Sequence, residues 1–163
     1  MEMSGDKLVA APPAAVWAAL IDPEFLKALI PGCESMTGDP ASGYDITVRR
    51  AVGGMSARMT GRFDLTDLRP AEGCLLTGHG RAGGAGEASG SCRIRLAPEG
   101  AGTRLSWQIA AETGGRLASI PDFIVTMAAR KVADGFVERF AAALEGRDPA
   151  ARKGWLGRIT GRG

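Results

Sequence analysis

The fold is decided by the stretch Leu117–Glu145, LASIPDFIVTMAARKVADGFVERFAAALE. Its apolar residues recur every three or four positions, the spacing that places side chains on one face of an α-helix. Those residues are Ile120, Ile124, Met127, Ala128, Val132, Phe136, Phe140 and Ala143. A helix over this stretch would be about 40 Å long at 1.5 Å per residue. Because its apolar stripe must be buried, the rest of the chain has to supply a covering surface.

That surface is predicted to be a β-sheet, because apolar and polar residues alternate with a period of two ahead of the helix. The alternating ranges are Tyr44–Val52, Met55–Thr66, Cys74–Ala82, Glu87–Leu96 and Leu105–Glu112. Short turns separate them, at Gly53-Gly54, Arg69–Gly73, Gly83–Gly86 and Pro98–Gly102. Turns of hairpin length predict antiparallel pairing.

The chain before the sheet predicts one strand and two short helices. Residues 2–9 form the opening strand, and Pro12-Pro13 suit the first turn of a helix that ends at Asp22-Pro23. A second helix, Glu24–Leu29, stops at Pro31-Gly32. The predicted fold class is therefore α+β, with about seven antiparallel strands, two short helices after the first strand and a long C-terminal helix.

Charge divides the chain unevenly. Its 163 residues carry a net charge of +2. Residues 147–163 hold five cations against Asp148, which makes +4 and leaves −2 for residues 1–146. We therefore predict one domain, 1–146, and a basic tail, 147–163; an acidic body argues against a nucleic-acid partner.

Three local motifs resemble the CoxG-like family of carbon monoxide dehydrogenase subunits, which belongs to the START and birch-pollen-allergen (SRPBCC) superfamily. They are VWAALIDPE at Val16–Glu24, IPGC at Ile30–Cys33 and GGRLA at Gly114–Ala118. The glycine-rich strand pair between Gly78 and Gly90 also matches, and the resemblance covers about residues 2–145. It implies a helix-grip fold, in which a curved sheet wraps round the long helix and leaves an apolar cavity.

The resemblance also implies a role. Members are non-catalytic accessories to a molybdenum-containing carbon monoxide dehydrogenase or a related hydroxylase, and they are associated with docking it at the cytoplasmic membrane. The implied cavity ligand is a lipid or a quinone, menaquinone or ubiquinone. Neither a covalent cofactor nor a metal is expected, and the protein is expected to be cytoplasmic, peripheral at the inner face of the membrane.

The stretch GHGRAG, Gly78–Gly83, has the G-x-G-x-x-G spacing of a dinucleotide-binding loop and contains the single histidine of the chain, His79. That loop requires a helix after it, whereas another alternating strand follows here. We therefore predict a strand, with Gly78 and Gly80 facing inward and His79 facing water.

Small residues on two neighbouring strands, surrounded by large apolar side chains, predict the cavity. The predicted lining is Met59, Phe63, Leu76, Gly78, Gly80, Gly90, Ile94, Trp107, Ile109, Ile120, Ile124 and Met127. The loop holding Ile30 and Pro31 is predicted to form the mouth. The alternative is that the glycines serve sheet curvature alone and that the helix fills the space.

No catalytic residue is predicted, because the inner faces hold no paired carboxylates. The cysteines, Cys33, Cys74 and Cys92, are too scattered for a metal site and are predicted to be reduced thiols. One alternative is a cyclase or hydrolase using the same cavity, with Arg50 and Asp67 as candidates at its edges. Another is an assembly adaptor with a filled core and no ligand.

The basic tail is predicted to contact the membrane, because it combines apolar side chains with cations. The predicted contact residues are Arg152, Lys153, Trp155, Leu156, Arg158 and Ile159. The segment ARKGWLGRITGRG is too short and too polar to span a bilayer, so we expect weak, reversible attachment. A disordered solubilising tail and a docking peptide for a protein partner are the alternatives.

Overall fold

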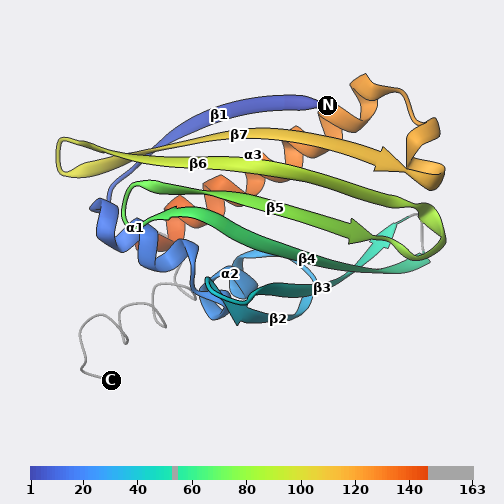
Figure 1. Ribbon diagram of the computed structural model, residues 1–163, viewed down its shortest axis with the longest axis horizontal. Helices are drawn as coiled ribbons and strands as arrows, with labels where there is room; N and C mark the ends of the chain where they lie inside the picture. The colour runs from blue at the N-terminus through green and yellow to red at the C-terminus, as the bar shows by residue number, and fades with distance from the viewer. Residues whose placement is uncertain (53–54, 147–163) are drawn as a thin grey trace.

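A computed structural model describes residues 1–52 and 55–146. Its antiparallel strands form one sheet in the order β1-β7-β6-β5-β4-β3-β2, with the helices on one face (Figure 1). The strands are β1 (Glu2–Val9), β2 (Cys33–Asp39), β3 (Gly43–Val52), β4 (Met55–Arg69), β5 (Gly73–Arg81), β6 (Glu87–Glu99) and β7 (Gly102–Gly114). The helices are α1 (Pro13–Leu20), α2 (Pro23–Leu29) and α3 (Asp122–Leu144), with 3₁₀ turns η1 (Gly83–Ala85) and η2 (Gly115–Ser119). The predicted fold class is confirmed.

One predicted boundary is wrong: the long helix begins at Asp122 rather than at Leu117. Pro121 holds the N-cap position with an extended backbone, and the residues before it form η2. Proline fits a helix start because it has no N–H to donate, whereas within a helix it would remove a hydrogen bond. The predicted Gly53-Gly54 turn lies outside the described residues.

The start of each short helix is determined by its first residues. Pro13 and Pro23 each begin a helix, where a missing N–H costs nothing. Asp22 caps α2, since its Oδ1 accepts hydrogen bonds from the backbone N–H of Glu24 (3.0 Å) and of Phe25 (3.3 Å). The capped helix buries Phe25, Leu26 and Leu29.

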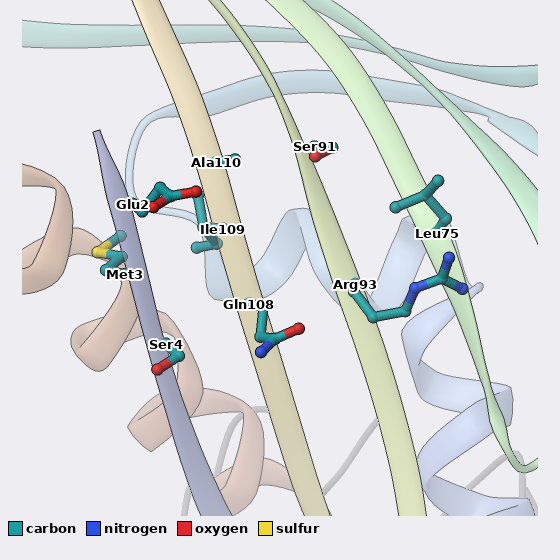
Figure 2. A pocket seen from close by; sticks show the side chains of 9 residues that line it. All are labelled: Glu2, Met3, Ser4, Leu75, Ser91, Arg93, Gln108, Ile109 and Ala110. Atoms are coloured by element: carbon teal, nitrogen blue, oxygen red, sulfur yellow. The ribbon is translucent and has the colours of Figure 1, made fainter.

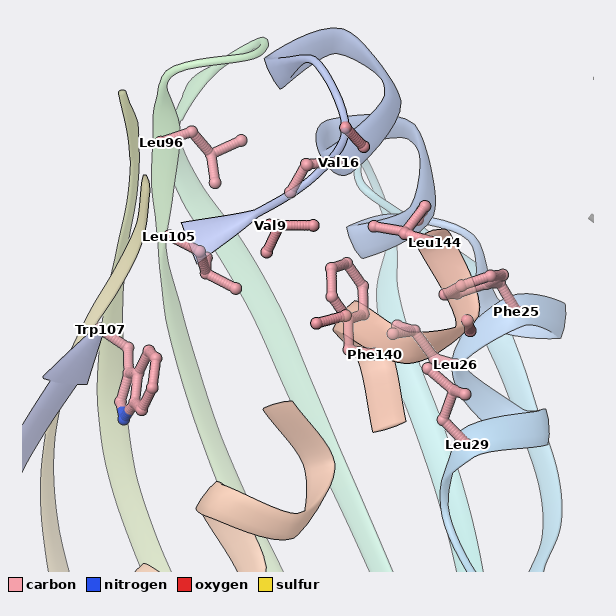
Figure 3. Packing of buried hydrophobic residues seen from close by; sticks show 14 of the residues in the cluster. Val9, Val16, Phe25, Leu26, Leu29, Leu96, Leu105, Trp107, Phe140 and Leu144 are labelled. Carbon is pink, nitrogen blue, oxygen red and sulfur yellow. The ribbon is translucent and has the colours of Figure 1, made fainter. Parts of the chain in front are cut away.

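The hydrophobic core is concentrated at one end of the interior, where α1 and α2 meet the last turns of α3 (Figure 3). Phe140 of α3 is fully buried, and its ring meets that of Phe25 edge-on at 5.7 Å between centroids. The first half of α3 has no such packing: Phe123 is 67% exposed and Met127 is 69% exposed. The interior is therefore packed at one end and open at the other.

Polar contacts hold α3 in place against α2 and β1. Arg139 Nε donates a hydrogen bond to the carbonyl oxygen of Leu29 at 2.7 Å, which ties the helix to the end of α2. Lys7 Nζ of β1 lies 2.9 Å from Glu138 Oε1, and Arg130 Nη1 donates to the carbonyl oxygen of Ser4 at 3.4 Å. These contacts hold α3 along β1.

Candidate functional site

The open end of the interior holds a cavity of about 750 Å³ between α3, η2 and the sheet. Its sheet residues come from β1, β6 and β7. The described residues that line it are Met1, Met3, Leu20, Ile30, Ala88, Cys92, Ile94, Leu105, Trp107, Ile109, Ala111, Thr113, Leu117, Ile120, Ile124, Val125, Ala128, Ala129, Val132, Ala133, Phe136 and Val137.

The lining is almost wholly apolar. Among these described residues no side chain carries a charge, and the polar side-chain groups are the Thr113 hydroxyl, the Trp107 indole N–H and the Cys92 thiol. Leu105 and Trp107 are buried at its inner end, whereas Ile124 and Val132 are exposed at its rim. A cavity of this size and character suits an apolar small molecule.

Five of the predicted lining residues lie in this cavity: Ile94, Trp107, Ile109, Ile120 and Ile124. From the predicted mouth, Ile30 lines it, whereas Pro31 is exposed and does not. Sequence reasoning missed most of the α3 residues, although Val125, Ala129 and Phe136 recur at helical spacing and could have been found by it.

Seven predicted lining residues lie outside the cavity: Met59, Phe63, Leu76, Gly78, Gly80, Gly90 and Met127. The first five belong to β4 and β5, and the cavity lies over β1, β7 and β6 instead. Phe63 stacks on Tyr44 with ring centroids 4.9 Å apart. Met127 is 69% exposed and lies away from Val125, Ala129 and Val132, which line the cavity.

The glycines on the inner face of the sheet differ in the space that their backbone leaves for a side chain. A Cβ on Gly90 would collide with the carbonyl oxygen of Ala110 and would lie 2.9 Å from the Cα of Ala111. A Cβ on Gly78 would lie 2.9 Å from the carbonyl oxygen of Arg62. Both positions are therefore close approaches of neighbouring strands. Gly80 differs, because its Cβ would meet only the Thr60 carbonyl oxygen, at an ordinary 3.5 Å.

The GHGRAG stretch is a strand followed by a turn. Gly73–Arg81 form β5, η1 follows, and the chain continues into β6. His79 is exposed, and its neighbours across the ladder are Arg62 and Ser89. The prediction that His79 faces away from the interior is confirmed, and the helix that a dinucleotide loop needs does not follow it.

A second hollow, of about 490 Å³, lies across β1, β7, β6 and β5 on the opposite face of the sheet (Figure 2). Ser4, Gln108 and Arg93 project into it, away from the helices. Arg93 is held by an ion pair with Asp67, 2.7 Å from its Nη1. This hollow is polar, in contrast with the cavity.

Arg50 and Asp67, the candidates for catalysis, lie outside the cavity, and Cys92 is the cysteine among its described lining residues. Asp67 sits on an exposed bulge of β4, and hydrogen bonds from Arg93 and then Arg69 lower the pKa of its carboxyl. Arg50 is exposed on β3. Burial raises the pKa of the Cys33 thiol, and it raises that of Cys92 to about 11, so both stay protonated near neutral pH.

Two further observations concern cysteines and metals. Cys33, Cys74 and Cys92 are free thiols, as predicted. Across residues 1–52 and 55–146, no group of three or more His, Cys, Asp or Glu side chains could hold a metal ion.

The predicted membrane-contact residues all belong to 147–163, which lies outside the described residues. They are Arg152, Lys153, Trp155, Leu156, Arg158 and Ile159. None of the helices that the structure describes is long and apolar enough to cross a bilayer.

Solved structures share this architecture. A conserved protein from Geobacillus kaustophilus is 22% identical, with a TM-score of 0.81 over 90% of this chain and 96% of that one. Ara h 8.0201, a helix-grip protein like the birch-pollen allergen, is 17% identical, with a TM-score of 0.63 over 90% and 98%. A protein from Rhizobium leguminosarum is 15% identical, with a TM-score of 0.68 over 91% and 95%. At these identities the likeness shows the helix-grip fold alone.

Comparison with curated protein sequences gives no significant match. The sequence does match one family model over residues 5–145, nearly the whole of the described part. The apolar cavity over β1, β6 and β7 is what the resemblance of the local motifs implied for this fold. The chain belongs to the CoxG family of carbon monoxide dehydrogenase subunits.

Proposed function

We propose that this protein is a non-catalytic accessory protein that binds a quinone or a lipid in the cavity beside α3. In that role it helps to associate a molybdenum hydroxylase of the carbon monoxide dehydrogenase type with the cytoplasmic membrane. The observation that carries the proposal is the cavity of about 750 Å³, whose described lining has no charged side chain. The family name supports the choice of partner enzyme.

The lining of the cavity argues for an apolar occupant. The cavity is open at its rim, so water or a ligand fills the space. Water finds few partners on an apolar wall. An apolar molecule that replaces it gains about 25 cal/mol per Å² of apolar surface buried.

The volume also limits how much of a ligand is enclosed. At ~30 Å³ per water-sized group, the cavity holds on the order of 25 non-hydrogen atoms. A quinone ring with a long isoprenoid chain, or a two-chain lipid, is larger than this. The remainder must leave through the rim near Ile124 and Val132, and it is best accommodated there if a bilayer lies against the rim.

Apolar side chains around the rim support a membrane contact. Ile124 and Val132 of α3 both line the cavity, yet they are 46% and 63% exposed. Exposed aliphatic groups of this kind suit the boundary between headgroups and acyl chains. The cations of residues 147–163 would add electrostatic attraction to an anionic leaflet, about 1 kcal/mol for each.

The ligand is tested by filling the cavity. Ala129→Phe places a ring in the space between α3 and the sheet, and Ala28→Phe makes the same change on the exposed surface of α2. Native mass spectrometry and solvent extraction of purified protein are expected to find an apolar molecule with wild type and with Ala28→Phe, and none with Ala129→Phe. If nothing apolar accompanies wild type and added menaquinone neither binds nor raises the Tm, the ligand proposal is wrong.

The membrane contact is tested by sedimentation with vesicles of phosphatidylglycerol and phosphatidylcholine. Ile124→Ser with Val132→Ser should weaken binding, and so should removal of residues 147–163. Leu68→Ser, which changes an exposed apolar residue of β4, is the matched control and should leave it unchanged. Equal binding by all four proteins would contradict the role of the rim and of the tail.

A further inference from the structure

The indole of Trp107 is held at the inner end of the cavity. Trp107 lies on β7, paired with Gly5 of β1 and with Ile94 of β6. It is only 8% exposed. The ring lies over Gly5, since a Cβ there would sit 2.9 Å from Cε2 and 3.1 Å from Cη2 of the indole. The absence of a side chain on Gly5 therefore makes the space that the ring occupies.

Among residues 1–52 and 55–146, the indole N–H of Trp107 has no hydrogen-bond partner. The other strongly buried polar side chains are satisfied: the Tyr44 hydroxyl donates to the Ile21 carbonyl oxygen, and the Thr103 hydroxyl donates to that of Ala11, both at 2.7 Å. In the part of the chain that the structure describes, Trp107 Nε1 makes no hydrogen bond. Every fully buried side-chain nitrogen or oxygen in that part does have a hydrogen-bond partner. The nitrogen is therefore not fully buried, and Trp107 lines the cavity.

The direction of the N–H agrees with this. Figure 3 shows the nitrogen on the edge of the ring that points away from Leu105 and Leu96, and so away from the packed core. An indole nitrogen donates a hydrogen bond and does not accept one. Buried tryptophans usually find an acceptor. A donor at the inner end of an apolar cavity calls for an acceptor atom on the molecule that fills it.

We infer that Trp107 Nε1–H donates a hydrogen bond to a carbonyl oxygen of the bound ligand. The ligand therefore enters with its carbonyl group first and its apolar chain toward Val132 and the rim. This inference rests on the proposed function. It narrows the ligand to apolar molecules that carry an acceptor, such as quinones or esters, and it disfavours pure hydrocarbons. Trp107 is then the residue that distinguishes ligands with a carbonyl oxygen from pure hydrocarbons.

The test compares two ligands with the same carbon skeleton, one with two carbonyl oxygens and one with none. The first is 2,3-dimethyl-1,4-naphthoquinone, whose ring offers no free position for thiol addition, and the second is 2,3-dimethylnaphthalene. Trp107→Phe keeps an aromatic ring and removes the donor. By equilibrium dialysis it should weaken quinone binding about 3- to 10-fold, as one neutral hydrogen bond implies. It should change hydrocarbon binding less than about 2-fold by the same reasoning.

Trp17→Phe is the matched control, because Trp17 packs on the core and does not line the cavity. It should change neither affinity. If both ligands bind wild type and Trp107→Phe weakens both equally, the hydrogen bond is refuted, whereas the proposal that the cavity binds an apolar ligand is retained. If neither ligand binds wild type, the proposed function fails and the inference fails with it.

A second measurement does not depend on the variant folding. In ¹H–¹⁵N spectra of wild type, the indole proton of Trp107 should move downfield with the quinone and not with the hydrocarbon, while that of Trp17 stays in place. Trp17→Phe and Trp155→Phe identify the Trp107 signal by elimination. An indole proton that responds equally to both ligands would overturn the inference.

Discussion

Two glycines on the inner face of the sheet should respond oppositely to the same substitution. Gly90→Ala adds a methyl group that would lie 2.9 Å from the Cα and 3.0 Å from the Cβ of Ala111, and closer still to the Ala110 carbonyl oxygen. These are backbone or near-backbone atoms of β7 that cannot rotate away. The strands must separate at the Gly90–Ala111 pair, and overpacking of this kind costs about 1–3 kcal/mol.

Gly80→Ala adds the same methyl group where it meets only the Thr60 carbonyl oxygen, at 3.5 Å. Alanine restricts the unfolded chain more than glycine, so this variant should gain about 0.5–1 kcal/mol. The two variants should therefore differ in free energy of unfolding by roughly 2–4 kcal/mol. For a chain of this length, that corresponds to a Tm difference on the order of 5–15 °C.

Urea denaturation followed by circular dichroism, with calorimetry for the Tm, measures the difference directly. Both residues face the interior, so a model in which the glycines merely clear space for a ligand predicts that the two variants unfold alike. Equal stabilities would refute the assignment of Gly90 to a close strand approach. A Gly80→Ala variant less stable than Gly90→Ala would refute it more strongly.

Two other groups make testable contributions to stability. Burial raises the pKa of Cys92 to about 11 from an ordinary value of 9.0, so between these values the unfolded chain loses a proton that the folded protein keeps. Stability should fall as pH rises through this window, by on the order of 2 kcal/mol, and Cys92→Ala should flatten that part of a urea titration; an unchanged slope would contradict the assignment to Cys92. Thr103→Val should lower the free energy of unfolding by about 1–3 kcal/mol, because it leaves the buried Ala11 carbonyl oxygen without its donor. Thr103→Ser keeps the hydroxyl and should retain most of that stability. Equal losses for the two variants in denaturation experiments would show that side-chain packing, and not the hydrogen bond, accounts for the effect.

Much of the fold was predictable because local pattern and tertiary role agree. Alternation over Met55–Thr66 and Glu87–Leu96 predicted strands that the structure places in β4 and β6. It also gave the correct inward face, since Leu76 pairs with Cys92 and Cys92 with the cavity residue Ile109. The start of α3 was misplaced because helical periodicity continues through Leu117, while Pro121 decides where the helix begins.

The half of the sheet that lies under α3 could not be predicted in this way. Phe63 and Trp107 are both large inward residues on alternating strands, and nothing local distinguishes them. What distinguishes them is the path of the helix, which depends on contacts of Arg139 with Leu29 and of Glu138 with Lys7, far apart in the sequence. Such contacts leave no periodic signal, so the predicted lining included residues of β4 and β5.

The pairing of β1 with β7 has a consequence for the order of folding. Glu2 of β1 lies opposite Ala110 of β7, so β1 can pair only after β7, the last strand of this sheet in the sequence, has been synthesised. The strands from β3 to β7 can pair with their predecessors over short loops, whereas β1 closes a loop of about a hundred residues, a slow step by contact order. Pulsed hydrogen exchange should protect β4–β5 amides before those of β1. Because Met3 of β1 lines the cavity, the binding site is complete only once β1 has paired with β7. A ligand that needs the complete site stabilises the folded protein by mass action.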